Sequence, residues 1–268
     1  MQNKIVIITG ASSGIGKAMA YEFSDHGSKV VMGARNIKAL EEIAADIRNK
    51  GGEVIFAQTD VSIEGDCKNL IQTAIDQYGK IDVLINNAGI SMRALFENTD
   101  IKVIKKLMDV NFWGAVFCTK FALPHILKQK GSIVAVSSIA GIKGLPARSG
   151  YSASKFALDG FMESLRVENL KNGLHVLIAY AGFTSSNIRN TSLSGVGTQQ
   201  GESPRDEDKM MTPDQVAVHI YNAVSKKKNK IVLTLQGKMI TVINKFFPDK
   251  LDKMIYNDLA KEHDSPFH

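Results

Sequence analysis

TGASSGIG, residues 9–16, directly follows the branched aliphatic run 5–8 near the start of the chain. Its glycines at 10, 14 and 16 permit unusual backbone dihedrals and carry no Cβ atom that would obstruct an approaching group. The residues that follow have apolar side chains at helical spacing. A strand, a glycine turn and a helix N-terminus together suit an anion, because free N–H groups and the helix dipole point outward. The alternative is a tight turn that needs glycine only for its geometry. Motifs elsewhere in the chain are needed to choose between this turn and an anion site.

Composition narrows the class of protein. The 268 residues are 44% hydrophobic and no Pro-, Ser- or Gly-rich linker divides them, which favours one large domain. Cys67 and Cys118 have neither CxxC nor histidine spacing, which indicates a reducing compartment and no metal site. The first residues run straight into a strand and no apolar run approaches the ~20 residues that span a bilayer. We therefore expect a cytoplasmic protein without a signal peptide.

Charge gives no reason to expect a nucleic-acid partner. The net charge of +6 is mild, and the 33 basic and 27 acidic residues are mostly interspersed. One dense run, residues 226–230, reads KKKNK and has no neighbouring aromatic residues on which bases could stack. A solvated helix end explains this run better.

Aliphatic runs alternate with helical periods along most of the chain. Strands are expected at about 4–9, 29–34, 53–57, 82–85, 131–137, 174–180 and 231–235. Helices are expected at about 14–26, 37–50, 64–78, 101–127, 151–171 and 213–225. This alternation predicts a single α/β, doubly wound, Rossmann-type domain over residues 1–235. Its mostly parallel seven-stranded sheet has helices on both faces and binds ligands at the carboxyl ends of its strands.

Two segments depart from this alternation. Residues 184–212 are polar and glycine-rich without a clear period, which is typical of a substrate loop or lid. Residues 236–268 form a C-terminal extension in which about 249–261 has one apolar helical face. That face consists of Leu251, Met254, Ile255 and Leu259. The helix packs on its own domain or a partner subunit or, with the pair Phe246-Phe247, rests on a membrane surface.

Further motifs follow in a fixed order. Asn86-Asn87-Ala88-Gly89 comes after the fourth expected strand, Asn111 lies in a helix, and Ser138 precedes Tyr-x-x-x-Lys at 151–155. Together with TGASSGIG, these motifs resemble the classical short-chain dehydrogenase/reductase family over roughly residues 4–190. The resemblance implies hydride transfer between a nicotinamide cofactor and a carbonyl or alcohol.

Tyr151 and Lys155 also make chemical sense without the family. Four residues apart on a helix, their side chains share one face. A tyrosine with a pKa near ~10 is a poor acid at neutral pH, whereas an adjacent ammonium stabilises the phenolate and lowers that pKa. A decrease of about two to three pH units requires about 3–4 kcal/mol. We expect Tyr151 to transfer the proton and Lys155 to assist it.

Ser138 and Asn111 complete the expected catalytic set. Ser138 ends the fifth strand and is expected to hydrogen-bond the substrate oxygen. Ser137 competes for this role, but neighbouring strand residues point to opposite faces and the family spacing favours Ser138. The resemblance gives Asn111 a water in a proton relay near Lys155. An ordinary buried structural amide is the alternative.

The resemblance also implies cofactor contacts at the strand ends, where residues 86–89 pass beneath the ribose and steady the sheet. The expected contacts are Gly10, Ser12, Ser13, Gly14, Ile15, Gly16, Asp60, Val61, Asn87, Ala88, Gly89, Tyr151, Lys155, Gly182, Phe183, Thr184 and Ser186. Asp60 has a helix N-cap as its alternative role. Ala181-Gly182 departs from the family's Pro-Gly and Ser186 from its threonine, which makes this loop less rigid.

The end of the second strand bears on cofactor choice. An NAD-specific site usually has a carboxylate there for the ribose 2′-OH, and Ala34 occupies that position. Arg35 follows and offers a planar fork to a 2′-phosphate, and Asn36 adds a donor. An ordinary surface arginine is the alternative. We expect NADP(H).

The sequence therefore predicts an NADPH-dependent reductase of a ketone to a secondary alcohol, acting on a hydrophobic or lipid-like substrate such as a long-chain lipid ketone. A steroid or a 3-oxoacyl thioester is the alternative substrate. A non-catalytic cofactor-sensing or scaffold protein of this fold would be expected to lose Ser138, Tyr151 or Lys155, and none is lost. The family also implies a homodimer or homotetramer that pairs helices 101–127 and 151–171. The C-terminal extension suggests peripheral membrane contact.

Overall fold

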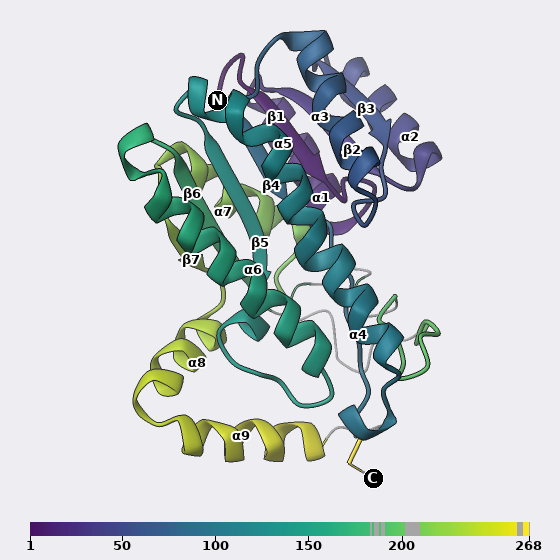
Figure 1. Cartoon of the computed structure of the whole chain (residues 1–268), viewed down its shortest axis with the longest axis vertical. Helices are drawn as coiled ribbons and strands as arrows, with labels where there is room; N and C mark the ends of the chain where they lie inside the picture. The colour runs from purple at the N-terminus through teal and green to yellow at the C-terminus, as the bar shows by residue number, and fades with distance from the viewer. Residues whose placement is uncertain (183, 185–187, 189–190, 202–209, 262–264, 268) are drawn as a thin grey trace.

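Seven parallel strands form one sheet in the order β3-β2-β1-β4-β5-β6-β7 (Figure 1). The computed structural model describes residues 1–182, 184, 188, 191–201, 210–261 and 265–267. The strands are β1 Ile5–Thr9, β2 Lys29–Ala34, β3 Val54–Gln58, β4 Val83–Asn86, β5 Ser132–Ser138, β6 His175–Ala181 and β7 Lys230–Val232. Each pairing between these described strands is parallel, so the predicted doubly wound sheet is confirmed.

Helices cover both faces of the sheet. On one face lie α1 Gly14–Asp25, α2 Ile37–Asn49 and α7 Pro213–Ser225. On the other lie α3 Glu64–Tyr78, α5 Gly114–Lys128 and α6 Ser149–Glu168. Strand β1 is buried on both sides: Val6 and Ile8 point to the first layer, whereas Ile5 and Ile7 point to the second. Such two-sided burial explains why its sequence is continuously aliphatic rather than alternating.

The strand order reverses direction between β1 and β4. The chain builds β1, β2 and β3 outward on one side, then returns to place β4 beside β1 and continues outward on the other. The connections leaving β1 and β4 therefore diverge, and they open a crevice at the carboxyl ends of these two strands. The glycine turn follows β1 and Asn87 follows β4, so both lie at this crevice.

The helical segment expected at 101–127 is confirmed, and its middle turn is a π-helix rather than an α-helix. α4 covers Ile101–Met108, a π-helical turn covers Asp109–Trp113, and α5 follows. Asn111 lies within the π turn and is buried. Turns of this kind are rare and often occur at functional sites, because the extra residue redirects side chains.

The chain after β7 differs most from expectation. The strand expected at 231–235 ends at Val232, and α8 begins at Leu235 and runs to Phe246. Thr234 caps α8 by accepting a hydrogen bond from Gly237 N at 3.0 Å on its Oγ1 atom. α9, Pro248–Ala260, matches the expected C-terminal helix to within one residue at each end.

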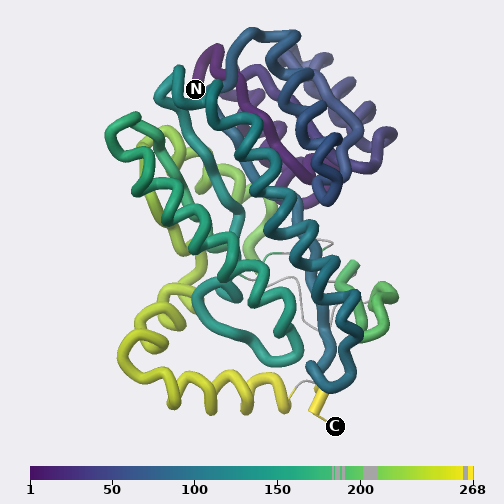
Figure 2. The backbone as a smooth tube through the Cα atoms, in the orientation of Figure 1, coloured from purple at the N-terminus to yellow at the C-terminus, as the bar shows by residue number. Residues whose placement is uncertain are grey.

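Helices α8 and α9 form an arch beyond the carboxyl edge of the sheet, below α6 in Figure 1 and coloured yellow in Figure 2. Two polar contacts tie the arch to the segment that follows β5. Asn244 Nδ2 donates to the carbonyl oxygen of Ile142 at 3.1 Å, and Lys143 Nζ lies 2.5 Å from Asp252 Oδ1. None of the described helices has the length and apolar character needed to cross a bilayer.

Candidate active site

A single cavity of about 740 Å³ joins the glycine turn, the strand ends, α6 and the C-terminal arch. All the predicted site residues that the structure describes line it, with the exception of Asn111. Phe183 and Ser186 lie outside the described residues. Predicted site residues up to 174 positions apart in the sequence, Gly10 and Thr184, therefore meet at the crevice between β1 and β4, where the topology predicts a ligand.

The glycine turn is fixed to the end of β4. Asn87 Nδ2 donates to the carbonyl oxygens of Thr9 at 2.9 Å and Gly10 at 3.3 Å. Thr9 Oγ1 in turn accepts from the backbone N–H groups of Asn87 at 3.0 Å and Ala88 at 3.1 Å. Gly10 has a φ of +67°, and a Cβ atom added there would lie 2.8 Å from the Cα of Ala88. Only glycine fits this position, and the turn is held rigidly.

The N-terminus of α1 opens into the cavity beside this turn. Ser13 is the N-cap residue, and its side chain makes no capping hydrogen bond. The first N–H groups of the helix are therefore left without a side-chain acceptor, and the first turn contains no acidic residue. Ser12, Ser13 and Gly14 line the cavity at this point. This arrangement fits the pyrophosphate of a dinucleotide, whose negative charge the helix dipole would favour.

Arg35 and Asp60 follow the carboxyl ends of β2 and β3, and both line the cavity together with the glycine turn. Arg35 is 68% exposed, and its Nη1 is 4.0 Å from Asp60 Oδ2. Partial burial disfavours the charged form of Asp60, but hydrogen bonds from Ser62 and the charges of Arg35 and Lys106 outweigh it and lower the carboxyl pKa. The alternative role of Asp60 as a helix N-cap is wrong, because α3 begins only at Glu64.

Asn36 has a structural role that the sequence analysis did not anticipate. It is the N-cap of α2, and its Oδ1 accepts from Ala39 N at 3.2 Å. The side-chain oxygen is therefore engaged with the helix, while the amide N–H₂ group remains available as a donor. Arg35 immediately precedes the cap and lines the cavity, and its contact with a 2′-phosphate stays a prediction.

Tyr151 and Lys155 lie on one face of α6 and are 8% and 4% exposed. Lys155 Nζ donates to the carbonyl oxygen of Val136 at 2.9 Å, and this bond holds the ammonium against β5. The same atom lies 5.8 Å from the centroid of the Tyr151 ring. A buried cation at this distance stabilises negative charge on the tyrosine oxygen, because little water screens it.

Ser138 and Ser137 occupy different environments. Ser138 is half-buried at the end of β5, and its Oγ accepts from Ala140 N at 3.2 Å, which leaves its O–H free to donate into the cavity. The Oγ of Ser137 is fully buried and has no hydrogen-bond partner among the described residues. The exposure of the two hydroxyls agrees with the choice of Ser138 over Ser137 made from strand alternation.

Asn111 makes the structural bonds of the alternative interpretation. Its Oδ1 accepts from Ile90 N at 2.8 Å, and its Nδ2 donates to Ile90 O and to Ser154 Oγ, both at 2.9 Å. The side chain thus joins the segment after β4 to α6. A Cβ atom added at Gly89 would lie 3.2 Å from Asn111 Oδ1 and 3.6 Å from Lys155 Nζ, so both atoms border the same space. The relay role stays a prediction.

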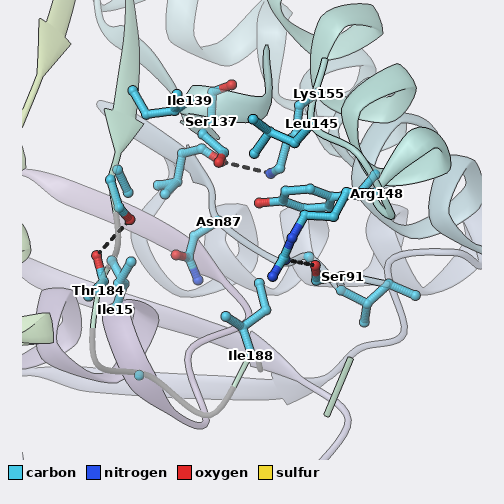
Figure 3. Close-up of a pocket in the computed structure, with 18 of the residues that line it drawn as sticks. Ile15, Asn87, Ser91, Ser137, Ile139, Leu145, Arg148, Lys155, Thr184 and Ile188 are labelled. Atoms are coloured by element: carbon cyan, nitrogen blue, oxygen red, sulfur yellow. Dashed lines mark hydrogen bonds between the residues drawn. The ribbon is translucent and has the colours of Figure 1, made fainter. Parts of the chain in front are cut away.

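The rest of the cavity lies beyond the predicted cofactor contacts, and a substrate is expected there. Arg148 donates from Nη1 to Ser91 Oγ at 3.0 Å on one side, while Thr184 and Ile15 lie on the opposite side (Figure 3). Described residues of three segments line this part: the stretch after β4, the stretch before α6 and the predicted substrate loop 184–212. These residues are Ser91, Leu145, Pro146, Arg148, Ile188, Thr191, Leu193 and Gln199.

The wall that α8 and α9 contribute to the cavity is not predicted by the sequence pattern. Its apolar lining residues are Met239, Ile240, Ile243, Leu251, Met254, Ile255 and Leu259. The apolar face predicted for α9 thus points into the cavity. The run 240–243 is rich in β-branched residues, which suit strands, and this composition hid α8. Thr234 as a capping residue was the available signal for the helix.

Comparisons with known proteins agree with this architecture. A family model described as short chain dehydrogenase matches residues 4–196. Over 187 residues the chain is 46% identical to 11-beta-hydroxysteroid dehydrogenase-like 2 of Arabidopsis thaliana, a match that covers 69% of this chain and 60% of the relative. Over 271 residues it is 32% identical to dehydrogenase/reductase SDR family member 7B of Mus musculus, covering 99% and 84%. The chain therefore spans less than two thirds of the Arabidopsis relative.

Solved structures show the same fold. A short-chain dehydrogenase/reductase from Burkholderia phymatum in complex with NAD has a TM-score of 0.83 at 22% identity, covering 93% of this chain and 95% of that one. An alcohol dehydrogenase from Thermococcus sibiricus complexed with 5-hydroxy-NADP has a TM-score of 0.76 at 23% identity, covering 87% and 96%. The two structures hold different nicotinamide nucleotides, so this likeness does not select one.

Proposed function

The chain belongs to the short-chain dehydrogenase/reductase family, and from that premise we propose that it is an NADPH-dependent reductase that converts a ketone to a secondary alcohol. The observation that carries this proposal is the meeting of Ser138, Tyr151 and Lys155 in one cavity with the glycine turn. A scaffold protein without turnover has no need of this arrangement.

Each of these residues has a separate task. Ser138 donates a hydrogen bond to the substrate carbonyl oxygen and orients it toward Tyr151. Tyr151 transfers its hydroxyl proton to that oxygen as the alcohol forms. Lys155 stabilises the tyrosine oxygen when the proton leaves. When bound, the nicotinamide cofactor supplies the hydride that reaches the carbonyl carbon.

A panel of carbonyl compounds tests the proposal. Full-length protein is mixed with NADPH and each compound in turn, and the loss of NADPH absorbance is followed. We expect turnover with at least one apolar ketone and none without a carbonyl compound. If NADPH binds but no ketone, steroid or 3-oxoacyl thioester is reduced, the scaffold alternative gains and the proposed activity is wrong.

The proposed preference for NADPH leads to the first prediction. Arg35→Ala should weaken NADPH about tenfold and NADH little, because only NADPH carries a 2′-phosphate. A hydrogen bond to a charged group contributes about 1.5–3 kcal/mol, and the exposure of Arg35 places it at the lower end. Lys38→Ala is the matched control, since Lys38 is an exposed cation on α2 that does not line the cavity. Dissociation constants for both nucleotides decide the matter: equal weakening of the two contradicts the assignment.

The substrate class follows from the apolar wall. One side of the substrate region consists of aliphatic and methionine side chains from α8 and α9, so transfer of an apolar ligand from water into it is favourable. We infer a hydrophobic, lipid-like ketone. A steroid ketone is the alternative substrate. The name of the Arabidopsis relative favours it, and so does that of 11-beta-hydroxysteroid dehydrogenase A from Arachis hypogaea. The latter is 37% identical over 261 residues, covering 96% of this chain and 73% of the relative.

We further propose that the outer face of α8 contacts a membrane surface. Exposed apolar residues that do not line the cavity recur there at helical spacing and are followed by an exposed phenylalanine; they are Leu235, Val242, Phe246 and Phe247. Lys238, Lys245 and Lys250 flank them and suit anionic headgroups. The apolar face of α9, in contrast, lines the cavity and is not available for this contact.

Liposome flotation tests the membrane contact and gives the second prediction. The full chain should float with vesicles that contain phosphatidylserine. Val242→Glu with Phe246→Glu should abolish flotation, because it replaces apolar side chains at the membrane contact with negative charges. Both residues are exposed and neither lines the cavity, so the active site should be unaffected. Ile63→Glu with Val218→Glu is the matched control, with the same charge change on exposed apolar residues that lie outside α8 and do not line the cavity. A wild-type chain that stays with the unbound fraction rules the contact out.

Pairing of the α5 and α6 surfaces leads to the third prediction, a homodimer or homotetramer. Trp113 and Phe156 are exposed there although they are large and apolar, and Trp113 stacks on Phe117 at 5.8 Å between ring centroids. Exposed aromatic residues of this kind are enriched at protein interfaces. Light scattering at micromolar concentration should give a multiple of 29.3 kDa, and Phe156→Glu should reduce it. A wild-type monomer contradicts the pairing.

A further inference from the structure

Arg148 is a cation in the cavity that the proposed reaction does not use. The cationic side chains that line the cavity among the described residues are Arg35, Lys106, Arg148 and Lys155. The charges of Arg35 and Lys106 both act on the carboxyl group of Asp60, on the expected cofactor side, and Lys155 assists the proton transfer. Arg148 has no task in either step, although a guanidinium stays charged throughout the physiological pH range.

A hydrogen bond to Ser91 fixes the position of this guanidinium. Arg148 Nη1 donates to Ser91 Oγ at 3.0 Å, and Figure 3 shows the side chain reaching from the start of α6 toward Ser91. Ser91 is buried, and its carbonyl oxygen accepts from the backbone N–H group of Leu193 at 2.9 Å. The anchor is therefore tied to a described part of the loop 184–212. A charged group that is already held in place loses little conformational freedom when a ligand binds.

The backbone just before Arg148 adopts an unusual conformation. Ala147 has a φ of +57°, in the left-handed region that residues other than glycine rarely adopt. Its carbonyl oxygen accepts from Ala94 N at 3.0 Å, and Leu145 N donates to Ser152 Oγ at 3.1 Å. Such a conformation persists only where the surrounding contacts fix it, which is frequent at ligand sites. The turn 145–148 is thus held in the one arrangement that places Arg148 at the cavity.

The surroundings of Arg148 suit a ligand that is acidic at one end and apolar at the other. Leu145 and Pro146 line the cavity next to it in the sequence, and the wall from α8 and α9 is apolar. Arg148 is half-buried, and a charge-assisted hydrogen bond is stronger where apolar groups exclude water. The planar fork of a guanidinium matches the oxygens of a carboxylate or a phosphate.

We propose that Arg148 is a specificity-determining residue, which binds an anionic oxyacid group of the substrate, either a carboxylate or a phosphate ester. Ser91 holds the guanidinium in position, and the apolar chain of the substrate lies against α8 and α9. Arg148 is three positions before Tyr151 and both line the cavity, so the acidic group belongs close to the ketone. This inference rests on the proposed function and narrows its substrate to an acidic, lipid-like ketone, which excludes a neutral steroid.

Matched ketones measure the expected preference. The full chain is assayed with NADPH and γ-oxodecanoate, with its methyl ester, and with the phosphate ester of a hydroxyketone of the same chain length. At least one acidic ketone should exceed the methyl ester in kcat/KM by about tenfold or more, as expected for a charge-assisted hydrogen bond. The preferred acid identifies the head group. If neither acidic ketone exceeds the ester, the proposal is wrong.

Arg148→Gln separates charge from hydrogen bonding, because glutamine keeps an N–H donor for Ser91 and carries no charge. It should lower the preference for the acidic ketone about tenfold or more, whereas Arg148→Lys should retain part of that preference. Ser91→Ala keeps the charge but removes its anchor, so the preference should fall by a smaller factor. An equal loss of kcat/KM for acid and ester in Arg148→Gln would show that Arg148 only positions α6, and would overturn the proposal.

Arg166→Gln is the matched control for this series. Arg166 lies near the other end of the same helix and does not line the cavity. The substitution is chemically the same as Arg148→Gln, so it should leave the preference for the acidic ketone unchanged. A decrease as large as that of Arg148→Gln would mean that general loss of positive charge causes the effect, which contradicts a local anion site.

Binding of decanoate gives a readout that needs no turnover. Decanoate has no ketone, so its Kd can be measured by calorimetry on the full chain with NADPH bound. Arg148→Gln should weaken decanoate about tenfold or more and decanol much less. An unchanged Kd for decanoate overturns the inference. If decanoate binding depends on Arg148 but no ketone is reduced, the proposed function fails and the anion site stands; if ketones are reduced without regard to Arg148, only the inference fails.

Discussion

Tyr151→Phe is expected to abolish carbonyl reduction and to leave the fold and the NADPH affinity almost unchanged. The substitution removes one oxygen atom, and the ring keeps its place in the buried hydrophobic cluster that also contains Met92, Leu107 and Leu193. A positioned proton donor contributes about 10²–10⁴-fold to the rate, so kcat should fall by that factor. The measurement is steady-state reduction of the best ketone from the panel, together with a fluorescence titration of NADPH.

Tyr256→Phe is the matched control for this prediction. Tyr256 is an exposed tyrosine on α9 that does not line the cavity, and its ring stacks on Phe267. Loss of its hydroxyl should leave kcat at the wild-type value. If Tyr151→Phe retains more than about a tenth of wild-type kcat, Tyr151 is not the proton donor, and the panel must be repeated with Ser138 variants.

Lys155→Met is expected to lower kcat about 100-fold and to weaken NADPH as well. Methionine has nearly the length of lysine but carries no charge, so the space is filled and the ammonium is lost. The ammonium stabilises the tyrosine oxygen when its proton leaves, and a loss of about 3 kcal/mol of such stabilisation corresponds to about 100-fold in rate. NADPH binding should weaken because Lys155 lines the cavity, where it is expected to hold the nicotinamide ribose.

Kinetics and binding must both be measured for this variant. Lys68→Met serves as the control, because Lys68 is exposed on α3 and far along the chain from the catalytic helix. A Lys155→Met enzyme with a wild-type kcat at saturating NADPH would show that the ammonium acts only in cofactor binding. A variant with normal NADPH affinity and a low kcat would limit its role to the proton transfer.

Local sequence patterns determined most of the sheet. Strands β1 to β6 begin and end within one residue of the expected positions, since each is a short aliphatic run bounded by polar or glycine residues. Alternation with helices is enough to predict parallel pairing, because a crossover helix returns the chain to the same edge of the sheet. The end of the seventh strand was predicted three residues too late. After Val232 the chain remains rich in β-branched residues, and only the cap at Thr234 marks the change to a helix.

Candidate site residues could be predicted where chemistry and spacing are local. Tyr151 and Lys155 are one helical turn apart, and TGASSGIG is a single turn between a strand and a helix. Their roles remain predictions, whereas their meeting in one cavity is observed. The doubly wound topology makes that meeting foreseeable, because it brings the carboxyl ends of all parallel strands to one edge.

Only the tertiary structure decided the features that depend on distant segments. The apolar stripe of α9 is evident in the sequence, but nothing local shows whether it faces a cavity, a partner or a membrane. The bonds of Asn111 to Ile90 and Ser154, and the bond of Arg148 to Ser91, likewise join residues 21 or more positions apart. The sequence by itself thus determined the strands, the glycine turn and the catalytic helix, whose causes are backbone preference and periodicity within one element. The residues of α8 and α9 that line the cavity depend on how whole helices pack against the rest of the domain. The free energy of that packing is a sum over contacts between distant segments, so no single segment determines it.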